Sequence, residues 1–447
     1  MLADPIAALA TPPGRSALAV IRLSGRGVFE VASRVIRGFV VEPPRVARLA
    51  PFVDAAGELV DRGIYLAYPA PRSYTGEDQV ELMCHGGTLV PARLLAALQA
   101  AGARPALPGE FTRRAVLNGK LDLVQAEAIG DLVEARVTAQ ARAALHQLDG
   151  ALSRRIAALR PLLLELQAAL SYEIDFPDED DGPVPRSRLA ETLDTVARRL
   201  DQLLATAPGA ARVREGAVVV LAGPPNSGKS SLFNALLGLD RALVTELPGT
   251  TRDAIEAPAD FHGWPIRLVD TAGLGEAQDR VDALGQAMSR RYIAAADLVL
   301  ECHDGSITEA DFRERRVAWG IADEGRVLRV RTKADLPPPA SGGEVRVSAV
   351  TGEGLDRLRA LVAERLFGEA VPLADLEPAL TRDRHRVALA RAREAVEAAR
   401  HHLAPEGDAV LAAHHVREAM LALDELIGPV DIEDVLDRLF ATFCVGK

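Results

Sequence analysis

The sequence predicts a multidomain α/β plus α protein. Short strand-like runs surround one helical run near the N-terminus, which is an α+β pattern. Two long segments, 122–204 and 381–439, have helical periodicity and are rich in Ala, Leu, Arg and Glu. Between them, apolar strand-like runs alternate with helical ones, as in α/β domains. We therefore expect an α/β domain inserted between two halves of an all-helical domain, which is common where chain termini lie close together.

The expected boundaries follow from these changes of pattern. The N-terminal α+β domain covers 1–118, the discontinuous helical domain 119–212 and 372–447, and the inserted domain 213–371. Strands of the first domain are expected at 17–23, 63–68 and 79–83, with a helix at 89–101. A loop rich in Asp, Glu, Gly and Pro is expected at 177–185, and a linker at 205–216.

Composition narrows the function classes. Hydrophobic residues make up 48% of the chain but aromatic residues only 4%, so the cores are built from Ala, Leu and Val, which favours helices. The net charge of −11 argues against broad nonspecific binding to nucleic acid. Cys84, Cys302 and Cys444 are too widely spaced for a disulfide framework or a zinc motif, which fits a reducing cytoplasm. We expect no membrane span, because no apolar run approaches the necessary length.

The strongest motif is a phosphate-binding loop. Residues 223–230 are Gly-Pro-Pro-Asn-Ser-Gly-Lys-Ser, which matches G-x-x-x-x-G-K-[ST], and they follow the apolar run 218–222. In such a loop the backbone N–H groups face the phosphates, Lys229 reaches the β- and γ-phosphates, and the Ser230 hydroxyl ligates Mg²⁺. The chain is therefore expected to bind a nucleoside triphosphate.

Four further signals follow in the order that a Ras-like GTPase requires. Gly-Thr-Thr-Arg-Asp at 249–253 is typical of a switch segment, in which Thr251 completes the Mg²⁺ shell. The run 266–269 leads into Asp-Thr-Ala-Gly, a D-x-x-G motif, at 270–273. The runs 327–331 and 345–347 lead into Thr-Lys-Ala-Asp at 332–335 and into Ser348-Ala349. Asp335 can accept from guanine N1–H and the 2-amino group, so the nucleotide is expected to be GTP.

These motifs give one set of expected GTP-binding residues. They are Asn226, Ser227, Gly228, Lys229, Ser230, Ser231, Thr245, Glu246, Leu247, Pro248, Gly249, Thr250, Thr251, Asp270, Thr271, Ala272, Gly273, Thr332, Lys333, Ala334, Asp335, Ser348 and Ala349. Thr332 stands where the guanine-reading motif has Asn, so one contact to the base or to the phosphate loop is expected to be lost. Leu274 stands where Ras-like proteins carry the water-orienting Gln. Asn226 and the segment 245–250 are similar to those of GTPases that bind a monovalent cation beside the phosphates.

Further motifs lie outside the inserted domain. They are Ala-Thr-Pro-Pro-Gly-Arg (10–15), Ile-Arg-Leu-Ser-Gly (21–25), Tyr-Thr-Gly-Glu-Asp (74–78), His-Gly-Gly (85–87), Pro-Gly-Glu-Phe-Thr-Arg-Arg-Ala (108–115), Asn-Gly-Lys-Leu-Asp-Leu (118–123), Gln-Ala-Glu-Ala (125–128) and Phe-Cys-Val-Gly-Lys (443–447). Together they resemble the tRNA-modification GTPase family MnmE, also called TrmE, along the whole chain.

The resemblance implies a K⁺-dependent GTPase. With the flavin-dependent partner MnmG (GidA), it adds a (carboxymethyl)aminomethyl group to C5 of the wobble uridine of certain tRNAs. The one-carbon unit comes from a tetrahydrofolate derivative, 5-formyl- or methylene-tetrahydrofolate, bound in an N-terminal domain that also forms the homodimer. GTP hydrolysis drives the conformational cycle.

The resemblance also assigns site residues. The implied K⁺ ligands are Asn226, Thr245, Leu247 and Thr250; the Mg²⁺ ligands are Ser230 and Thr251; and the folate-binding residues are Arg22, Glu81, Lys120 and Lys447. The catalytic residues are Lys229 and Asp282. Asp282 replaces the Glu that usually orients the hydrolytic water in the family, and Glu276 or Asp279 are alternatives to it. Cys444 lies near the implied folate site, although a lone Cys is usually a small buried hydrophobic residue.

Two other functions remain open. One is a ribosome-assembly GTPase of the Era/Der type, but no RNA-binding KH pattern with its G-x-x-G loop follows the inserted domain. The other is a folate enzyme with a regulatory GTPase insert, which would transfer its one-carbon unit without a partner protein.

Overall fold

The structure is a computed structural model of the chain. It describes residues 4–41, 43–176, 184–238, 255–271, 280–305, 308–321, 323–336, 345–368, 380–404, 407–427 and 446. The chain separates into two compact units. The first unit comprises Met1–Gly130, Gln147–Val196 and Arg391–Lys447, and the second comprises Asp131–His146 and Ala197–Ala390. The three-domain boundaries expected from the sequence stay a prediction.

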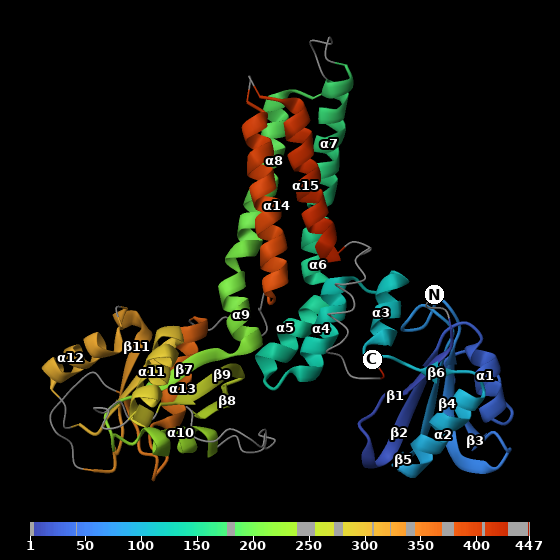
Figure 1. Ribbon diagram of the computed structural model, residues 1–447, viewed down its shortest axis with the longest axis horizontal. Coiled ribbons are helices and arrows are strands. Elements are labelled where there is room, and N and C mark those ends of the chain that lie inside the picture. The colour runs from blue at the N-terminus through green and yellow to red at the C-terminus, as the bar shows by residue number, and fades with distance from the viewer. Residues whose placement is uncertain are drawn as a thin grey trace. The chain divides into compact units, whose positions relative to one another are not determined.

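A six-stranded sheet forms the N-terminal part of the first unit, with the strand order β3-β4-β5-β2-β1-β6 (Figure 1). Its strands are β1 (Ile6–Leu9), β2 (Gly14–Ser24), β3 (Arg48–Val53), β4 (Leu59–Tyr68), β5 (Gln79–Gly87) and β6 (Arg104–Pro105). All pairs are antiparallel except β1 with β6. Alternate residues of β2, such as Ile21 and Leu23, are buried against helices α1 (Val28–Val35) and α2 (Leu89–Ala100). The predicted strands and helix of this region are confirmed.

The rest of the first unit is helical. Helices α3 (Glu110–Leu117), α6 (Ala151–Ala157), α7 (Arg160–Asp175) and α15 (Ala409–Ile427) lie within it, and α4 (Leu123–Glu134), α8 (Arg186–Ala205) and α14 (Asp383–His402) each lie partly in it and partly in the second unit. Helices far apart in the sequence lie side by side, α15 with α7 and α14 with α8 (Figure 1). Each buries an apolar stripe at helical spacing, such as Leu163, Leu166 and Leu170 of α7. No helix in these described segments is both long and apolar enough to span a bilayer.

A buried ion cluster fixes the loop between β4 and β5. Arg114 of α3 is only 1% exposed, and its guanidinium contacts the carboxylates of Glu110 at 2.9 Å, Glu77 at 3.1 Å and Asp4 at 3.1 Å. Burial would raise the pKa of Glu110, but hydrogen bonds from Arg104, the Leu107 N–H and Arg114 outweigh it, so that pKa is lowered. Since Glu77 lies between β4 and β5, the cluster anchors that loop to α3.

The second unit is a doubly wound α/β structure. Its sheet has the order β12-β11-β10-β7-β9-β8, parallel except for β8 against β9. The strands are β7 (Ala217–Ala222), β8 (Ile255–Phe261), β9 (Trp264–Asp270), β10 (Leu298–His303), β11 (Val327–Arg331) and β12 (Val345–Arg346). Its helices include α5 (Thr138–Leu148), α9 (Ala207–Glu215), α10 (Lys229–Gly238), α11 (Arg280–Ala295), α12 (Glu309–Trp319) and α13 (Leu355–Phe367), with the 3₁₀ turn η1 (Glu324–Arg326).

Successive residues of β7 supply two separate cores. Val219 and Leu221 pack with α10 and α13, whereas Val220 and Ala222 pack with residues of α11 and α12 on the other face. A strand buried on both faces has no polar alternation, which is why the run 218–222 is continuously apolar. The predicted strands of the α/β domain are thereby confirmed.

The predicted linker at 205–216 is wrong in its main part, because helix α9 covers Ala207–Glu215. Pro208 stands in the first turn, where a missing N–H costs nothing, and Gly216 ends the helix at φ 86°. Ala207, Ala210 and Val213 are buried, and Arg212 forms an ion pair with Asp297 at 2.8 Å. The predicted loop at 177–185 lies mainly outside the described residues.

Candidate nucleotide site and N-terminal pocket

The phosphate-loop motif lies between the end of β7 and the start of α10. Asn226 and Gly228 have positive φ angles of 63° and 84°. Asn tolerates the left-handed conformation better than most residues, so its place in this turn is physically reasonable. A Cβ at Gly228 would come within 3.2 Å of the Thr332 side chain, so the loop needs glycine there for space as well as for conformation.

Lys229 holds the loop closed. Its Nζ donates to the carbonyl oxygens of Gly223 at 3.0 Å and Pro224 at 2.9 Å. Burial lowers the pKa of Lys229, and the negative charge of Asp270 partly opposes that shift. The ammonium group of Lys229 is buried, and the two carbonyl oxygens that accept from it carry no charge. An anion beside it would therefore be favourable, so this loop is able to hold a phosphate.

Asp270 and Ser230 come together beside this lysine. Burial raises the pKa of Asp270, and a hydrogen bond from Ser230 opposes that shift. Oδ1 of Asp270 is buried with no hydrogen-bond partner among the described residues. A carboxylate oxygen in need of a partner beside a hydroxyl fits a hard divalent cation such as Mg²⁺. Thr271 has another contact, because its hydroxyl donates to the Leu221 carbonyl at 2.7 Å.

The base-reading motif is connected to the phosphate loop. The Thr332 hydroxyl lies 2.6 Å from the Ser227 carbonyl and 3.0 Å from the His303 carbonyl, as a donor to both. Lys333 donates from Nζ to the Asn226 carbonyl at 2.9 Å. Thr332 thus keeps a contact to the phosphate loop even though it has no amide.

Asp335 is oriented by the last motif of the series. Oδ1 of Asp335 accepts from the Ser348 hydroxyl at 2.7 Å, and this bond lowers the pKa of Asp335. The Ala334 N–H donates to the Val347 carbonyl at 3.0 Å, which places Ser348-Ala349 beside 334–335. A fixed carboxylate that stays ionised can accept two parallel N–H bonds from a base edge.

Other predicted residues are not part of this geometry. Ser231 is exposed on α10. The side chain of Asp282 is outside the described part of α11. Thr245, Glu246, Leu247, Pro248, Gly249, Thr250, Thr251, Ala272, Gly273, Cys444 and Lys447 lie outside the described residues. The expected K⁺ ring and switch segment therefore remain predictions.

The first unit has a pocket of about 540 Å³ at the end of its sheet. Its lining residues are Arg45, Tyr68, Arg72, Ser73, Tyr74, Gln79, Glu81 and Lys120. Glu81 and Lys120 were expected from the sequence, and the others were not. Strand alternation could have placed Gln79 near Glu81, because residues two apart in a strand share one face of the sheet. Tyr68 pairs with Gln79 across β4 and β5 and so lies on that face too. Arg45 and Arg72 come from loops, which no period in the sequence aligns.

Arg22 and Glu81 are direct partners across β2 and β5, with Nε 2.9 Å from Oε1. Glu81 also accepts from the Tyr68 hydroxyl and from Nε2 of Gln79, each at 3.3 Å. The Arg22 guanidinium lies 5.4 Å above the Tyr74 ring and donates to the Gly446 carbonyl at 3.4 Å, so the chain end is beside it. Arg22, Glu81 and Lys120 therefore share one region.

The pocket offers one carboxylate, one amide and several cations. Oε1 of Gln79 is buried without a hydrogen-bond partner in the described segments, so it can still accept from a ligand. Lys120 donates to the Pro71 carbonyl at 3.2 Å, and Arg45 to the Arg72 carbonyl at 2.7 Å. Such a pocket suits a planar heterocycle with a donor–acceptor edge and an anionic tail.

Comparison with known proteins identifies relatives along the whole chain. The family model described as the GTP-binding protein TrmE N-terminus matches residues 5–120, and that of the MnmE helical domain matches 123–444. A tRNA modification GTPase MnmE of Thermus thermophilus is 45% identical over 452 residues, covering 100% of both chains. One from Aquifex aeolicus is 40% identical over 457 residues, covering 99% of this chain and 100% of that one. The solved G domain of the T. maritima FeoB iron transporter is 29% identical, covering 33% of this chain and 98% of that one, with a TM-score of 0.26.

Proposed function

Because the chain belongs to the MnmE family of tRNA modification GTPases, and is thus a GTP hydrolase, we propose that it modifies C5 of the wobble uridine in certain tRNAs. The added group is aminomethyl or carboxymethylaminomethyl, made together with the flavin-dependent protein MnmG (GidA). The observation that carries the proposal is that one chain combines the phosphate loop at 223–230 with the polar pocket around Glu81.

The nucleotide site supports roles for named side chains. Lys229 supplies positive charge to the phosphates, and Asp335 accepts from the guanine edge. Ser230 and Thr251 would ligate Mg²⁺, with Asp270 behind them; the ion neutralises charge that develops between the β- and γ-phosphates. The Asn226 side chain would ligate K⁺ together with Thr245, Leu247 and Thr250. Asp282 would position water, since Leu274 cannot.

The N-terminal pocket supports a tetrahydrofolate derivative as ligand. Glu81 and Gln79 present acceptors to the donor edge of a pterin, and Arg22 holds Glu81 in place. Arg45, Arg72 and Lys120 supply cations for the glutamate tail, to which Lys447 would add. A volume of about 540 Å³ falls within the range of small-molecule sites.

We further propose a homodimer formed by the N-terminal domain and a cytoplasmic location.

Full-length similarity to tRNA modification GTPases favours this function over ribosome assembly. The test compares tRNA nucleosides, by mass spectrometry, from cells with and without the protein. Loss of the modified wobble uridine is expected, and an unchanged profile would overturn the proposal. GTP turnover measured in K⁺ and in Na⁺ tests the proposed cation site, since equal rates would show that hydrolysis does not require K⁺.

The ligand is tested by titrating 5-formyl-tetrahydrofolate into the purified chain. Glu81→Gln removes the negative charge but keeps the shape, and should weaken binding at least roughly tenfold, because hydrogen bonds to charged groups are worth about 1.5–3 kcal/mol. Glu30→Gln, at an exposed position on α1, is the matched control. If Glu81→Gln binds the folate as tightly as the wild type and Glu30→Gln do, the pocket is excluded as the folate site.

A further inference from the structure

Histidines are concentrated in the hairpin of α14 and α15. Four of the nine histidines of the chain occur between residues 401 and 415. His401 and His402 lie at the end of α14, and His414 and His415 lie in α15. The His402 ring stacks on the His415 ring with 5.6 Å between centroids, so the two helices bring their imidazoles together. The nucleotide site and the N-terminal pocket use none of these residues.

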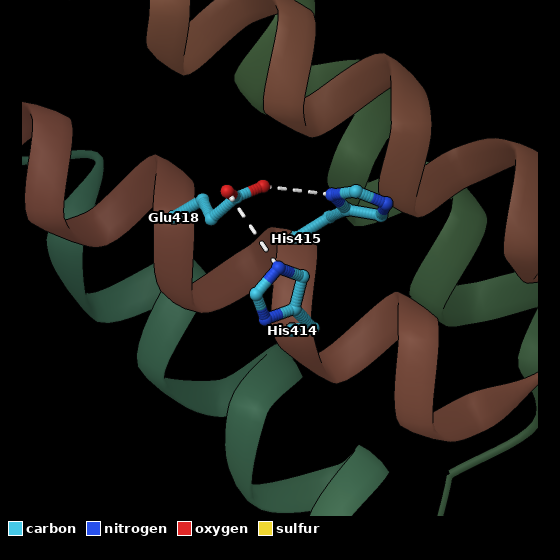
Figure 2. A group of neighbouring side chains, drawn as sticks. All are labelled: His414, His415 and Glu418. Atoms are coloured by element: carbon cyan, nitrogen blue, oxygen red, sulfur yellow. Dashed lines mark hydrogen bonds and ion pairs between the residues drawn. The ribbon is translucent and has the colours of Figure 1, made fainter.

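Both imidazoles of α15 face one carboxylate (Figure 2). Glu418 follows His414 by four residues and His415 by three, which places all three on one helix face. Nδ1 of His415 lies 2.8 Å from Oε2 of Glu418, and Nε2 of His414 lies 3.6 Å from Oε1. The hydrogen bond from His415 lowers the pKa of Glu418, so its carboxylate is ionised.

We propose that His414, His415 and Glu418 bind a divalent transition-metal ion, Zn²⁺ or a chemically similar one. The three candidate ligand atoms lie within 4.8 Å of one another. Zn–N and Zn–O bonds of about 2.0–2.1 Å place tetrahedral ligands about 3.3 Å apart, so ligand atoms that already lie within 4.8 Å of one another need only rotations of their side chains to reach that spacing. An ion would thus replace the proton between His415 and Glu418 and draw in His414, with little movement of the helix.

The ligand set determines the kind of ion. Two imidazoles and one carboxylate suit Zn²⁺, Ni²⁺ or Cu²⁺, whereas Mg²⁺ and Ca²⁺ prefer oxygen ligands alone. Three protein ligands leave at least one position to water, and the side chains of His414 and Glu418 are 60% and 50% exposed. We therefore expect an open, exchangeable site that binds more weakly than a closed structural zinc site.

His402 has a positioning role in this site. Its ring covers one face of the His415 imidazole from the neighbouring helix and thereby restricts rotation of that ring. The connection between the helices is held by Arg186 of α8, which donates to the carbonyls of Ala404 at 3.1 Å and Gly407 at 3.3 Å. A bound ion would therefore stabilise two helices whose adjoining residues Ala404 and Gly407 are already held by Arg186.

The test is calorimetric titration of Zn²⁺ into the full-length, metal-stripped protein without a histidine tag. One ion should bind, and His415→Gln and Glu418→Gln should each weaken that binding at least roughly tenfold, the range found when a metal site loses a supporting group. His262→Gln is the matched control, because His262 also faces a carboxylate, that of Asp356 at 3.3 Å, in the second unit. Cys444→Ser should bind Zn²⁺ as the wild type does, which excludes a thiol site.

A Co²⁺ titration supplies a second measurement, since its absorption reports the geometry of the ligands. His402→Gln should lower the affinity less than His415→Gln does. Far-UV circular dichroism and unchanged GTP turnover establish that the variants are folded. If the wild type binds no Zn²⁺, or if His415→Gln and Glu418→Gln bind it as tightly as the wild type, the three residues are only a hydrogen-bonded group on a helix surface and the proposal is wrong.

Discussion

Replacing Thr332 by Val tests the link between the base-reading motif and the phosphate loop. Val has nearly the shape of Thr and removes only the hydroxyl. The His303 carbonyl keeps a donor, the Thr332 N–H at 2.8 Å, whereas the Ser227 carbonyl loses its 2.6 Å bond to the hydroxyl. One buried acceptor that loses its donor costs about 1–3 kcal/mol.

That cost is divided between folding stability and nucleotide affinity. In the free variant the phosphate loop can open so that water reaches the Ser227 carbonyl, and GTP binding then has to close the loop. If the whole cost of about 3 kcal/mol falls on binding, the Kd for GTP rises roughly 150-fold. Trp264 and Trp319 are the two tryptophans of the chain and both lie in the second unit, so their fluorescence during urea unfolding reports its stability.

Thr112→Val is the matched control for the Thr332 variant. Thr112 is also fully buried and hydrogen-bonded, to the Tyr74 hydroxyl at 2.8 Å, but it belongs to the first unit. It should leave both GTP affinity and tryptophan-detected unfolding unchanged. If Thr332→Val changes neither the urea midpoint nor the Kd for GTP, the hydroxyl does not hold the loop and the reasoning fails.

Three other changes test separate parts of the structure. Asp335→Asn offers an N–H where guanine also offers one, so GTP should bind roughly 10- to 150-fold more weakly while xanthosine triphosphate gains, which competition binding would detect. Burial lowers the pKa of His303 to about 4, below the value of about 6.5 in the unfolded chain. As the pH falls, the unfolded state therefore takes up the proton first. The free energy of unfolding should decrease between about pH 6.5 and pH 4, by at most about 3 kcal/mol. His303→Gln should flatten that part of the urea stability profile, and an unaltered slope would contradict this cause. Arg114→Met removes one of the two guanidinium partners of the buried Glu110, which keeps its ion pair with Arg104, and should destabilise the first unit by about 1.5–3 kcal/mol, seen as an earlier thermal transition in far-UV circular dichroism.

The sequence predicted those parts of the fold that depend on local periodicity. The strands β7, β9, β11 and β12 were found because each is a short strand-like run before a motif, and β11 has the predicted bounds, Val327–Arg331, whereas β8 and β10 precede no motif and were not specified. Helix α9 was missed because Pro208 and Gly209 indicate a linker when burial is not considered. Only the structure shows that its apolar side is covered.

Site prediction had the same limit. Lys229, Asp270 and Asp335 belong to motifs with fixed spacing, so their positions at or just after the ends of β7, β9 and β11 were predictable. Arg45 and Arg72 reach the N-terminal pocket from loops on either side of β3 and β4, and no spacing rule relates them to Glu81. The contact of Thr332 with Ser227 joins residues 105 positions apart and depends on parallel strand order, which a single motif does not contain.

The pairing of β2 with β5 has a consequence for insertions and deletions. The ladder is unbroken from Leu18 opposite His85 to Ser24 opposite Gln79, and Arg22 opposite Glu81 lies within it. Shifting either strand by one residue would turn that strand's charged side chain to the other face of the sheet and so separate Arg22 from Glu81. The ladder is irregular between Gly14 and Leu18, where a change in length alters no pairing near Arg22. An added residue is therefore tolerable before Leu18. An added residue between Leu18 and Ser24 would leave the sheet folded but would separate Arg22 from Glu81 at the N-terminal pocket.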